Sequence, residues 1–282
     1  MSAASGVVRL GDRLYVVADD EPAMAVFELE GRPLTGEPRP RAGDPEPLTG
    51  DLIPLDETEL PTGHAERKAA KPDLESLCLL PDGTLFTLGS GATERRERGW
   101  LLPPDGEPCE VSLSRLHAAL REELADLNIE GAAVARERLW LAQRGNGKEG
   151  ENALIELDLD QTLAGLGEHR AIDPTALRGI TRHDLGDVEG VELTFSDLCP
   201  LPGGRLLFCA VAEAGESTYF DGDCVGAALG VLDDGGVSRL DPLAEPYKIE
   251  GVSVARGSDL LLVADGDDRS TPAPLLAASL PF

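Results

Sequence analysis

The feature that most constrains the fold of this chain is a unit of strand, tight turn and second strand that recurs five times. Each copy opens on a polar residue followed by an apolar run. A second apolar run begins with Leu nine or ten residues later. The phrase is clearest at Ile129-Glu130-Gly131 and again at Ile249-Glu250-Gly251. The five opening residues are Ser5, Glu75, Glu130, Ser196 and Glu250.

The turns and spacing of these copies indicate a β-propeller. Pro81-Asp82-Gly83 and Pro202-Gly203-Gly204 supply residues that tolerate positive φ in hairpin turns. The opening residues are 70, 55, 66 and 54 positions apart, the size of a four-stranded blade with variable connections. Weaker strand-like runs follow the hairpins at Ala23–Leu29, Gly99–Leu102, Ala153–Leu157, Gly226–Leu232 and Pro274–Leu280. We predict an all-β, single-domain β-propeller with five blades, with six blades as the alternative. The predicted blades are approximately 1–60, 61–125, 126–190, 191–243 and 244–282.

Some segments fit this repeat poorly. Helical periodicity is convincing only in Leu113–Leu127, and Gly31–Arg67 is typical of a long irregular excursion with one outer strand near Leu52–Leu55. In the fourth blade Val188–Val191 also imitates the opening phrase, but Ser196 gives the better spacing to the second strand. The last blade has only three candidate strands, so the pattern does not explain how the ring closes.

The chain is strongly acidic, with a formal net charge of −27 over 282 residues. Such a charge repels nucleic-acid phosphates and anionic membranes, so we expect neither partner. No apolar run approaches the roughly 18 residues of a membrane span, and Met1–Ser5 lacks the basic segment of a secretory signal. The five cysteines form no CxxC pair and are odd in number, as expected of small buried side chains in a reducing compartment. We therefore expect a cytoplasmic protein.

The five opening residues should converge, because the innermost strand of each propeller blade lines the central axis. Three glutamates brought together there repel one another and either take up protons or share a cation. Carboxylate and hydroxyl oxygens suit Ca²⁺, while the absence of His and Cys argues against zinc or copper. We expect Ca²⁺ to be bound by Ser5, Glu75, Glu130, Ser196 and Glu250. The alternative is that these residues line a water-filled channel.

Residues at the ends of the second strands should surround this ring, because each hairpin returns to the end at which it began. Clustered cations beside a metal suit a small anionic ligand such as a phosphate ester or a carboxylate. All four lysines and several arginines lie in segments that should reach this face: Lys68, Lys71, Lys148, Lys248, Arg95, Arg96, Arg98, Arg144 and Arg269. For the arginines between 95 and 98, which alternate with glutamates, a solvated charged loop is the alternative.

The order Ser, Glu, Glu, Ser, Glu, one from each of five blades, resembles the axial calcium ring of the calcium-dependent soluble nucleotidases (apyrases). Those proteins are five-bladed propellers that hydrolyse nucleoside di- and triphosphates, and the resemblance covers the ring and the strand pairs that carry it. As a whole, the sequence is similar to a family of bacterial propellers near the phytase-like and SdiA-regulated groups. The similarity lies in phrases such as Asp73–Leu77, Gln143–Gly147 and Ile249–Val252. It implies the fold and no established substrate.

Two hypotheses for function follow. The first is a calcium-centred propeller that binds a small anionic ligand and acts as a metal-assisted phosphoric-ester or anhydride hydrolase. In it the cation holds the phosphate and the nucleophilic water, Glu130 or Asp265 acts as base, and Arg144 steadies the charge. The second is a non-enzymatic binding or interaction propeller whose axial ion is structural. The pattern indicates neither a substrate nor an oligomeric state.

Overall fold

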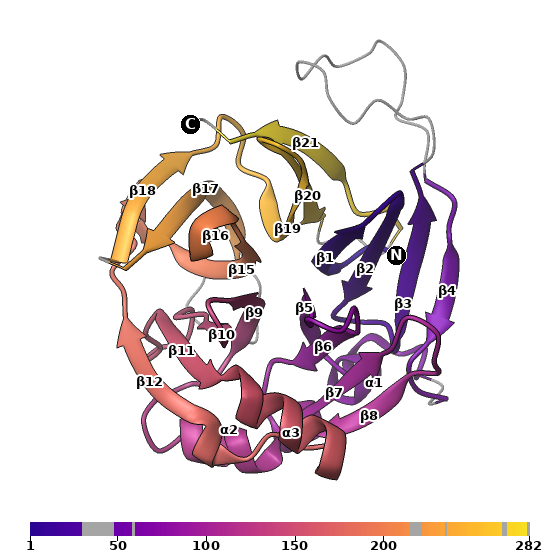
Figure 1. The fold of residues 1–282 in the computed structure, drawn as a ribbon. Coiled ribbons are helices and arrows are strands. Elements are labelled where there is room, and N and C mark those ends of the chain that lie inside the picture. The colour runs from indigo at the N-terminus through magenta and orange to yellow at the C-terminus, as the bar shows by residue number, and fades with distance from the viewer. Residues whose placement is uncertain (30–47, 58–59, 215–221, 235, 267–269, 281–282) are drawn as a thin grey trace.

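Five β-sheets stand in a ring around a central axis and confirm the predicted five-bladed β-propeller (Figure 1). The computed structural model describes residues 1–29, 48–57, 60–214, 222–234, 236–266 and 270–280. Four sheets have four strands each, in simple meander order, and the last has three among these residues. The blades are thus built from local hairpins, as the repeat predicts.

The first blade is formed by β1 (Ala4–Leu10), β2 (Arg13–Ala18), β3 (Ala23–Glu28) and β4 (Asp51–Pro54). The second is formed by β5 (Leu74–Leu79), β6 (Leu85–Gly89), β7 (Arg98–Leu102) and β8 (Cys109–Ser112). The third is formed by β9 (Ile129–Ala135), β10 (Arg138–Gln143), β11 (Ala153–Asp158) and β12 (Leu177–Arg182). The fourth is formed by β15 (Thr194–Pro200), β16 (Leu206–Ala214), β17 (Asp223–Asp233) and β18 (Gly236–Pro242). The fifth is formed by β19 (Lys248–Arg256), β20 (Asp259–Asp265) and β21 (Leu275–Ser279).

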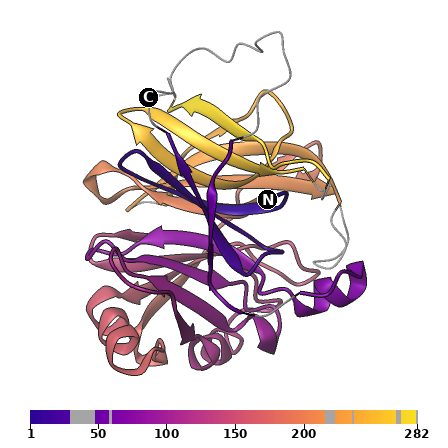
Figure 2. The same ribbon diagram turned by 90° about the vertical axis from the view of Figure 1, so that its right-hand side faces the viewer.

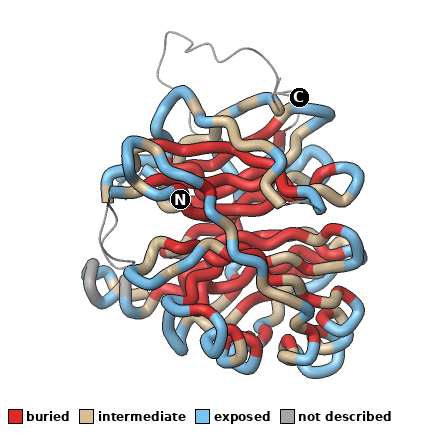
Figure 3. The backbone as a smooth tube through the Cα atoms, turned by 90° about the vertical axis from the view of Figure 1, so that its left-hand side faces the viewer, coloured by how far each residue is buried: buried red, intermediate tan, exposed pale blue. Residues whose placement is uncertain are grey.

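The hydrophobic core lies between neighbouring blades. Five clusters of buried side chains each join two adjacent sheets within the described chain. Between the first and second blades, for example, Val17 and Met24 pack against Leu77 and Trp100. Each fully buried aliphatic side chain contributes roughly 1.5–3 kcal/mol relative to leaving it exposed. Figure 3 shows the consequence: the strands are buried along their middles and exposed at their turns.

Glycines let the innermost strands approach one another closely. A Cβ on Gly131 of β9 would lie 2.8 Å from the backbone nitrogen of Leu198 on β15. A Cβ on Gly6 would likewise lie 3.0 Å from a backbone nitrogen of the next inner strand, and a Cβ on Gly251 would lie 3.2 Å from one. Each of these glycines directly follows an opening residue. An opening residue followed by glycine therefore combines a polar side chain at the axis with a close backbone contact between blades.

The ring closes by packing of β1 beside β19 and β20, and no strand of the described residues is exchanged between the fifth and first sheets. The backbone N–H of Arg9 donates to Ser253 Oγ at 3.0 Å, and its guanidinium donates to the carbonyl of Ala255 at 2.6 Å. At the outer side, the N–H of Ala273 donates to the carbonyl of Met1 at 3.1 Å. A three-stranded last blade is therefore compatible with a closed ring.

Helices connect some of the blades, and only part of them was predicted. The expected helix over Leu113–Leu127 is shorter, α2 (Ser114–Leu120), with Leu124 packing from the following turn. The sequence pattern missed α3 (Leu159–His169), because glycines at 165 and 167 weaken its propensity and only three of its residues are buried. It also missed α1 (His64–Ala70), which begins within the predicted excursion and extends beyond its end. In Figure 1, α2 and α3 lie outside the second and third blades, and Figure 2 shows α1 beyond the ends of the strands.

The segment Val188–Val191, whose sequence resembles the opening phrase, lies in a separate hairpin outside the blades. This hairpin pairs β13 (Asp187–Val188) with β14 (Val191–Glu192). Ser196 instead lies on the inner strand β15, fully buried. All five cysteines are free thiols, and Cys78, Cys199 and Cys209 are buried. In the part of the chain that the structure describes, no helix is both long and apolar enough to cross a membrane.

Candidate functional site

Each opening residue is the extra residue of a β-bulge. The pairing of every inner strand with its blade's second strand shifts by one residue at Ser5, Glu75, Glu130, Ser196 or Glu250. A bulge leaves the extra residue outside the ladder and re-aims its side chain. The same irregularity therefore recurs five times at the same end of the axis. It sets these five residues apart from the rest of the inner strands.

Arg144, which directly follows β10, carries the central positive charge at this end and is only 4% exposed. Its Nη1 atom lies 3.4 Å from Oε2 of Glu130 and 3.5 Å from Oε1 of Glu250. Its Nη2 atom binds a carboxylate oxygen of Glu213 on β16, and its Nε donates to Thr194 Oγ1 at 3.2 Å. The partners come from the third, fourth and fifth blades. One buried guanidinium thus connects three blades.

Lys248 supplies a second buried cation, an ammonium, beside Arg144. Its Nζ atom lies 3.1 Å from Oε1 of Glu213, 3.8 Å from Oε1 of Glu250 and 3.6 Å from Oδ2 of Asp265. Burial by itself lowers the pKa of Lys248, but the charges of Glu250, Glu213 and Asp265 outweigh burial and raise it. The lysine therefore stays charged, and Asp265 is held at the site by an ion pair.

A second group of charges surrounds Asp73, on the side of the first and second blades. Lys71 Nζ binds Asp19 and lies 3.0 Å from Oδ1 of Asp73. Oδ2 of Asp73 lies 2.9 Å from Arg96 Nη1 and accepts a hydrogen bond from Ser90. The backbone of Asp73 has a φ of 59°, which is unusual for a residue with a side chain. This strained conformation places a buried carboxylate two residues before Glu75.

Together these two groups form what we term the axial site. Within the described chain it holds seven carboxylates and four cations, so its formal charge is negative. An excess of carboxylates in such a buried or half-buried cluster favours the uptake of protons or of a cation. The carboxylates are Asp19, Asp73, Glu75, Glu130, Glu213, Glu250 and Asp265, and the cations are Lys71, Arg96, Arg144 and Lys248.

The pKa shifts at the axial site follow from that excess. Burial, and then repulsion from Glu130, raises the pKa of Glu75 well above its usual range. Burial also raises the pKa of Glu250 well above its usual range, although Arg144 and Lys248 oppose the shift. Burial is also the main cause that raises the pKa values of Glu130 and Asp19. Each of these carboxylates is thus more stable when a positive charge or a proton joins it.

The two serines of the predicted ring make different contacts from the glutamates. Ser196 Oγ donates to the carbonyl of Ile249 at 2.6 Å, and the neighbouring Asp197 accepts the N–H of Val252 at 2.7 Å. Ser5 Oγ donates to the carbonyl of Ala3 at 3.3 Å. Ser196 therefore joins the fourth inner strand to the fifth. Its oxygen keeps lone pairs, so a role as a metal ligand stays a prediction.

Three carboxylates satisfy a geometric test for a metal site. Asp19, Asp73 and Glu75 each offer an oxygen, and these oxygens lie within 4.8 Å of one another. All three are hard ligands of the kind that Ca²⁺ prefers. In addition, Oε2 of the buried Glu250 has no hydrogen-bond partner among the described residues. The donor set thus fits a hard cation, and it lies to one side of the predicted five-membered ring.

Other predicted rim residues are distributed more widely. Lys148 is exposed, and Arg98 lies on β7, 3.4 Å from Glu110 and over the ring of Trp100. Arg269 and the side chain of Lys68 lie outside the described residues. The structure therefore places Lys71, Lys248, Arg96 and Arg144 at the axial site, each bound to carboxylates.

Apart from Lys248, sequence reasoning assigned no role to the residues two positions before the opening residues. Asn128 Nδ2 donates to Oε1 of Glu130 at 2.6 Å, and Asp73 and Thr194 occupy the equivalent positions in their blades. Gln143, fully buried, fixes this region by accepting the backbone N–H of Asn128 at 2.8 Å. The period of two along a strand places such residues on the same face. Polar residues at this offset were the available signal.

A family model described as a family of unknown function (DUF6929) matches residues 1–280. The chain belongs to this family. No curated protein matches the chain. The apyrase and phytase-like resemblances therefore stay expectations, and the family assignment adds no substrate.

Several solved structures are similar in fold. A luciferin-regenerating enzyme is 9% identical with a TM-score of 0.49, over 98% of this chain and 90% of that chain. The WD40 repeats of RRP9 are 9% identical with a TM-score of 0.44, over 94% and 74%. A gluconolactonase from Xanthomonas campestris is 15% identical with a TM-score of 0.40, over 74% of this chain and 58% of that chain. At such identities the likeness is one of fold alone.

Proposed function

We propose that the axial site binds Ca²⁺ through Asp19, Asp73 and Glu75, and that the propeller uses this ion to hold a small anionic ligand. The observation that supports the proposal is the approach of three carboxylate oxygens to within 4.8 Å of one another. Carboxylates this close repel unless a cation lies between them. The strained backbone of Asp73 and the bulge at Glu75 bring two of the three into place.

Lys71 is the built-in competitor of such an ion. Its ammonium already binds Asp19 and lies 3.0 Å from Asp73. A divalent cation on the same oxygens therefore has to displace the ammonium, which becomes available to an anion beside the ion. This exchange explains how an acidic site can receive an anionic ligand: the ion and the released ammonium both carry positive charge toward it.

Hydrolysis is the finer form of this proposal. Bound Ca²⁺ would attract and orient a phosphoryl group and an attacking water molecule. Glu130 is suited to accept a proton, because burial raises its pKa above the ordinary value of a glutamate. Arg144 has its charge balanced by Glu130, Glu213 and Glu250, so it can steady a developing charge only after giving up one of these partners. Asp265 is bound to Lys248 in the same way.

A structural role for the axial charges is the second candidate, and one observation favours it. Arg144 binds carboxylates from three blades while almost fully buried. Such a network holds the blades together at the axis whether or not a ligand binds. In this case an ion at Asp19, Asp73 and Glu75 would complete the same cross-link on the other side.

Calcium titration of three variants separates these candidates. We expect Asp73→Asn to weaken Ca²⁺ binding measured by calorimetry, and Lys71→Met to strengthen it, because Lys71 no longer competes. Glu107→Gln changes an exposed residue of the β7–β8 turn and serves as the matched control. Equal Ca²⁺ affinities in all three variants would contradict a calcium site at Asp19, Asp73 and Glu75. If Ca²⁺ binds as expected but a panel of nucleotides, phytate and aryl phosphates is neither bound nor hydrolysed, the structural role is supported instead.

A further inference from the structure

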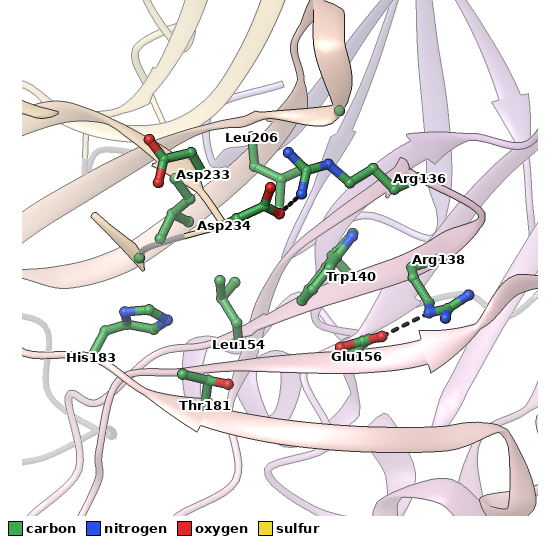
Figure 4. A pocket seen from close by; sticks show the side chains of 13 residues that line it. Arg136, Arg138, Trp140, Leu154, Glu156, Thr181, His183, Leu206, Asp233 and Asp234 are labelled. Carbon is green, nitrogen blue, oxygen red and sulfur yellow. Dashed lines mark hydrogen bonds and ion pairs between the residues drawn. The ribbon is translucent and has the colours of Figure 1, made fainter. Parts of the chain in front are cut away.

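A cavity of about 420 Å³ opens between the third and fourth blades, separate from the axial site. Its floor is formed by the buried side chains of Leu154, Leu206 and Leu232, with Trp140 of β10 along one wall (Figure 4). The indole N–H of Trp140 donates to the carbonyl of Ala135 at 3.2 Å, so the rest of the ring offers apolar surface to the cavity. A volume of this size and such a lining are typical of small-molecule sites.

Arg138 and Glu156 stand beside Trp140 at the edge of the cavity. Glu156 is the cross-strand partner of Trp140, and Arg138 lies two residues before Trp140, so the three side chains share one face of the third blade. Nε of Arg138 donates to Oε1 of Glu156 at 2.7 Å, and its Nη1 donates to the carbonyl of Glu137 at 3.0 Å. Within the described chain, Nη2 of Arg138 and Oε2 of Glu156 make no hydrogen bond, and the two side chains are 34% and 33% exposed. An N–H donor and a carboxylate acceptor are therefore available beside the indole ring.

A second ion pair, between the blades, lies at the mouth of the cavity. Arg136, which directly follows β9, pairs with Asp234 of the fourth blade, as Figure 4 shows. The backbone of Arg136 has a φ of 53°, in a hairpin turn where Asn or Gly is usual. Gly204 on the facing blade makes room for the arginine, because a Cβ there would lie 2.3 Å from Arg136 Cγ. The strained turn and the glycine together hold this pair in place.

The charges around the cavity are compensated, which disfavours a charged ligand. Arg136 is paired with Asp234 and Arg138 with Glu156, and Asp233, which also lines the cavity, has a partner within the protein. A ligand charge attracted by one member of an ion pair is repelled by the other. A purely apolar ligand is disfavoured as well, because it would remove water from donors and acceptors without replacing its hydrogen bonds. The cavity therefore suits a neutral molecule with an apolar face and polar groups at its edge.

We propose that this cavity binds a pyranose sugar without a charged substituent. The C–H groups on one face of a pyranose ring form a flat apolar surface, which packs against the indole ring of Trp140 and over the leucine floor. A sugar hydroxyl both donates and accepts hydrogen bonds. Neighbouring hydroxyls donate to Oε2 of Glu156 and accept from Nη2 of Arg138 without separating that ion pair. This site is independent of the axial site and of any ion bound there.

Calorimetric titration of the whole chain with neutral and charged sugars tests this proposal. The neutral probes are the methyl glycosides of glucose, galactose and mannose, which differ in the orientation of single hydroxyl groups. We expect saturable binding of at least one of them at millimolar concentrations or below, unchanged by a calcium chelator. The uronate and the amino-sugar derivative of the same sugar should bind more weakly because they are charged, and open-chain sorbitol because it lacks the ring face.

Tryptophan fluorescence locates the bound sugar. Of the two tryptophans, Trp100 is 1% exposed in the core and Trp140 lines the cavity. Binding should therefore change the emission of Trp140. Trp140→Leu removes the flat ring, so both the change in emission and most of the calorimetric signal should be lost.

Substitution of Glu156 tests the compensated ion pair. Glu156→Gln keeps the shape of the side chain but leaves Arg138 without its carboxylate. Affinity for the neutral glycoside should fall about fivefold, the value of one hydrogen bond, and the uronate should gain relative to it. Glu110→Gln is the matched control, because Glu110 is the cross-strand partner of the buried Trp100 and lies 3.4 Å from Arg98. It should change affinity less than about twofold.

Three results would overturn the proposal: no saturable binding of any of the three methyl glycosides, equal affinity of the wild type for the neutral sugar and its uronate, or equal effects of Glu156→Gln and Glu110→Gln. Melting curves show whether the variants are folded. Glu156→Gln alters a partly exposed side chain, so it decides the question even if Trp140→Leu does not fold.

Discussion

Arg144 of the third blade reaches Glu250 of the fifth, with Nη1 3.5 Å from Oε1. The same nitrogen lies 3.4 Å from Glu130, and the other terminal nitrogen binds Glu213 of the fourth blade. A side chain of the protein therefore places a positive charge beside two of the three glutamates of the predicted ring. The three carboxylates whose oxygens approach within 4.8 Å of one another include Asp19 and Asp73, which lie beside Lys71.

Replacement of Arg144 by Met should destabilise the protein by about 3–5 kcal/mol, because it leaves buried carboxylates without their partner. Urea unfolding at neutral pH measures the change in the free energy of unfolding. Arg13, whose pair with Glu28 is exposed, is the control, and Arg13→Met should cost less than about 1 kcal/mol. Similar costs for the two substitutions would show that the buried network contributes no more than a surface pair.

The buried imidazole of His117 predicts a pH dependence of stability. Burial, with a smaller contribution from Arg121, lowers the pKa of His117 to about 4. Between pH 4 and the unfolded value of about 6.5, the unfolded chain binds the extra proton, so the free energy of unfolding falls as the pH falls. The full effect is about 3 kcal/mol.

Urea unfolding at a series of pH values from neutral to acidic measures this loss. His117→Leu should make the profile flatter in that range. His169→Asn alters an exposed histidine and should leave the slope unchanged. A slope that survives His117→Leu would assign the effect to other groups.

Gly131 should not tolerate a methyl group. In Gly131→Ala the new Cβ would lie 2.8 Å from the backbone nitrogen of Leu198, so the inner strands β9 and β15 must separate. We expect a loss of about 1–3 kcal/mol in the free energy of unfolding. Gly179→Ala on the outer strand β12 has nothing within 4 Å of its Cβ and is the matched control. If both variants have the same stability as the wild type, the inner strands are not in close backbone contact.

Calcium affinity should increase with pH. Burial raises the pKa of Glu75 and of Asp19, so protons compete with the ion for these oxygens. Each proton displaced changes the affinity by up to about tenfold per pH unit. Calorimetry in buffers of different ionisation enthalpy measures the proton release directly, and Glu75→Gln should reduce it. An affinity independent of pH would contradict ligation by these carboxylates.

The repeat was sufficient to predict the five blades, because hairpins are local and their turn residues are visible in the sequence. The bulges were not visible, since an extra residue in a strand changes pairing without changing composition. The partners in ion pairs could not be predicted either, because a contact such as that of Arg144 with Glu213 depends on how two blades pack together. The cavity beside Trp140 could not be predicted, because it is lined by strands of two different sheets.

The closure between β1 and β19 makes one boundary of the ring different from the other four. The peptide chain itself crosses every other boundary, whereas this one is held by side-chain packing and a few hydrogen bonds such as that from Arg9 to Ser253. Local opening of the native state is therefore concentrated here. Amide hydrogens of β1 and β21 should exchange with solvent at a lower free energy than those of β10 and β16, so the molecule can open on one side without global unfolding.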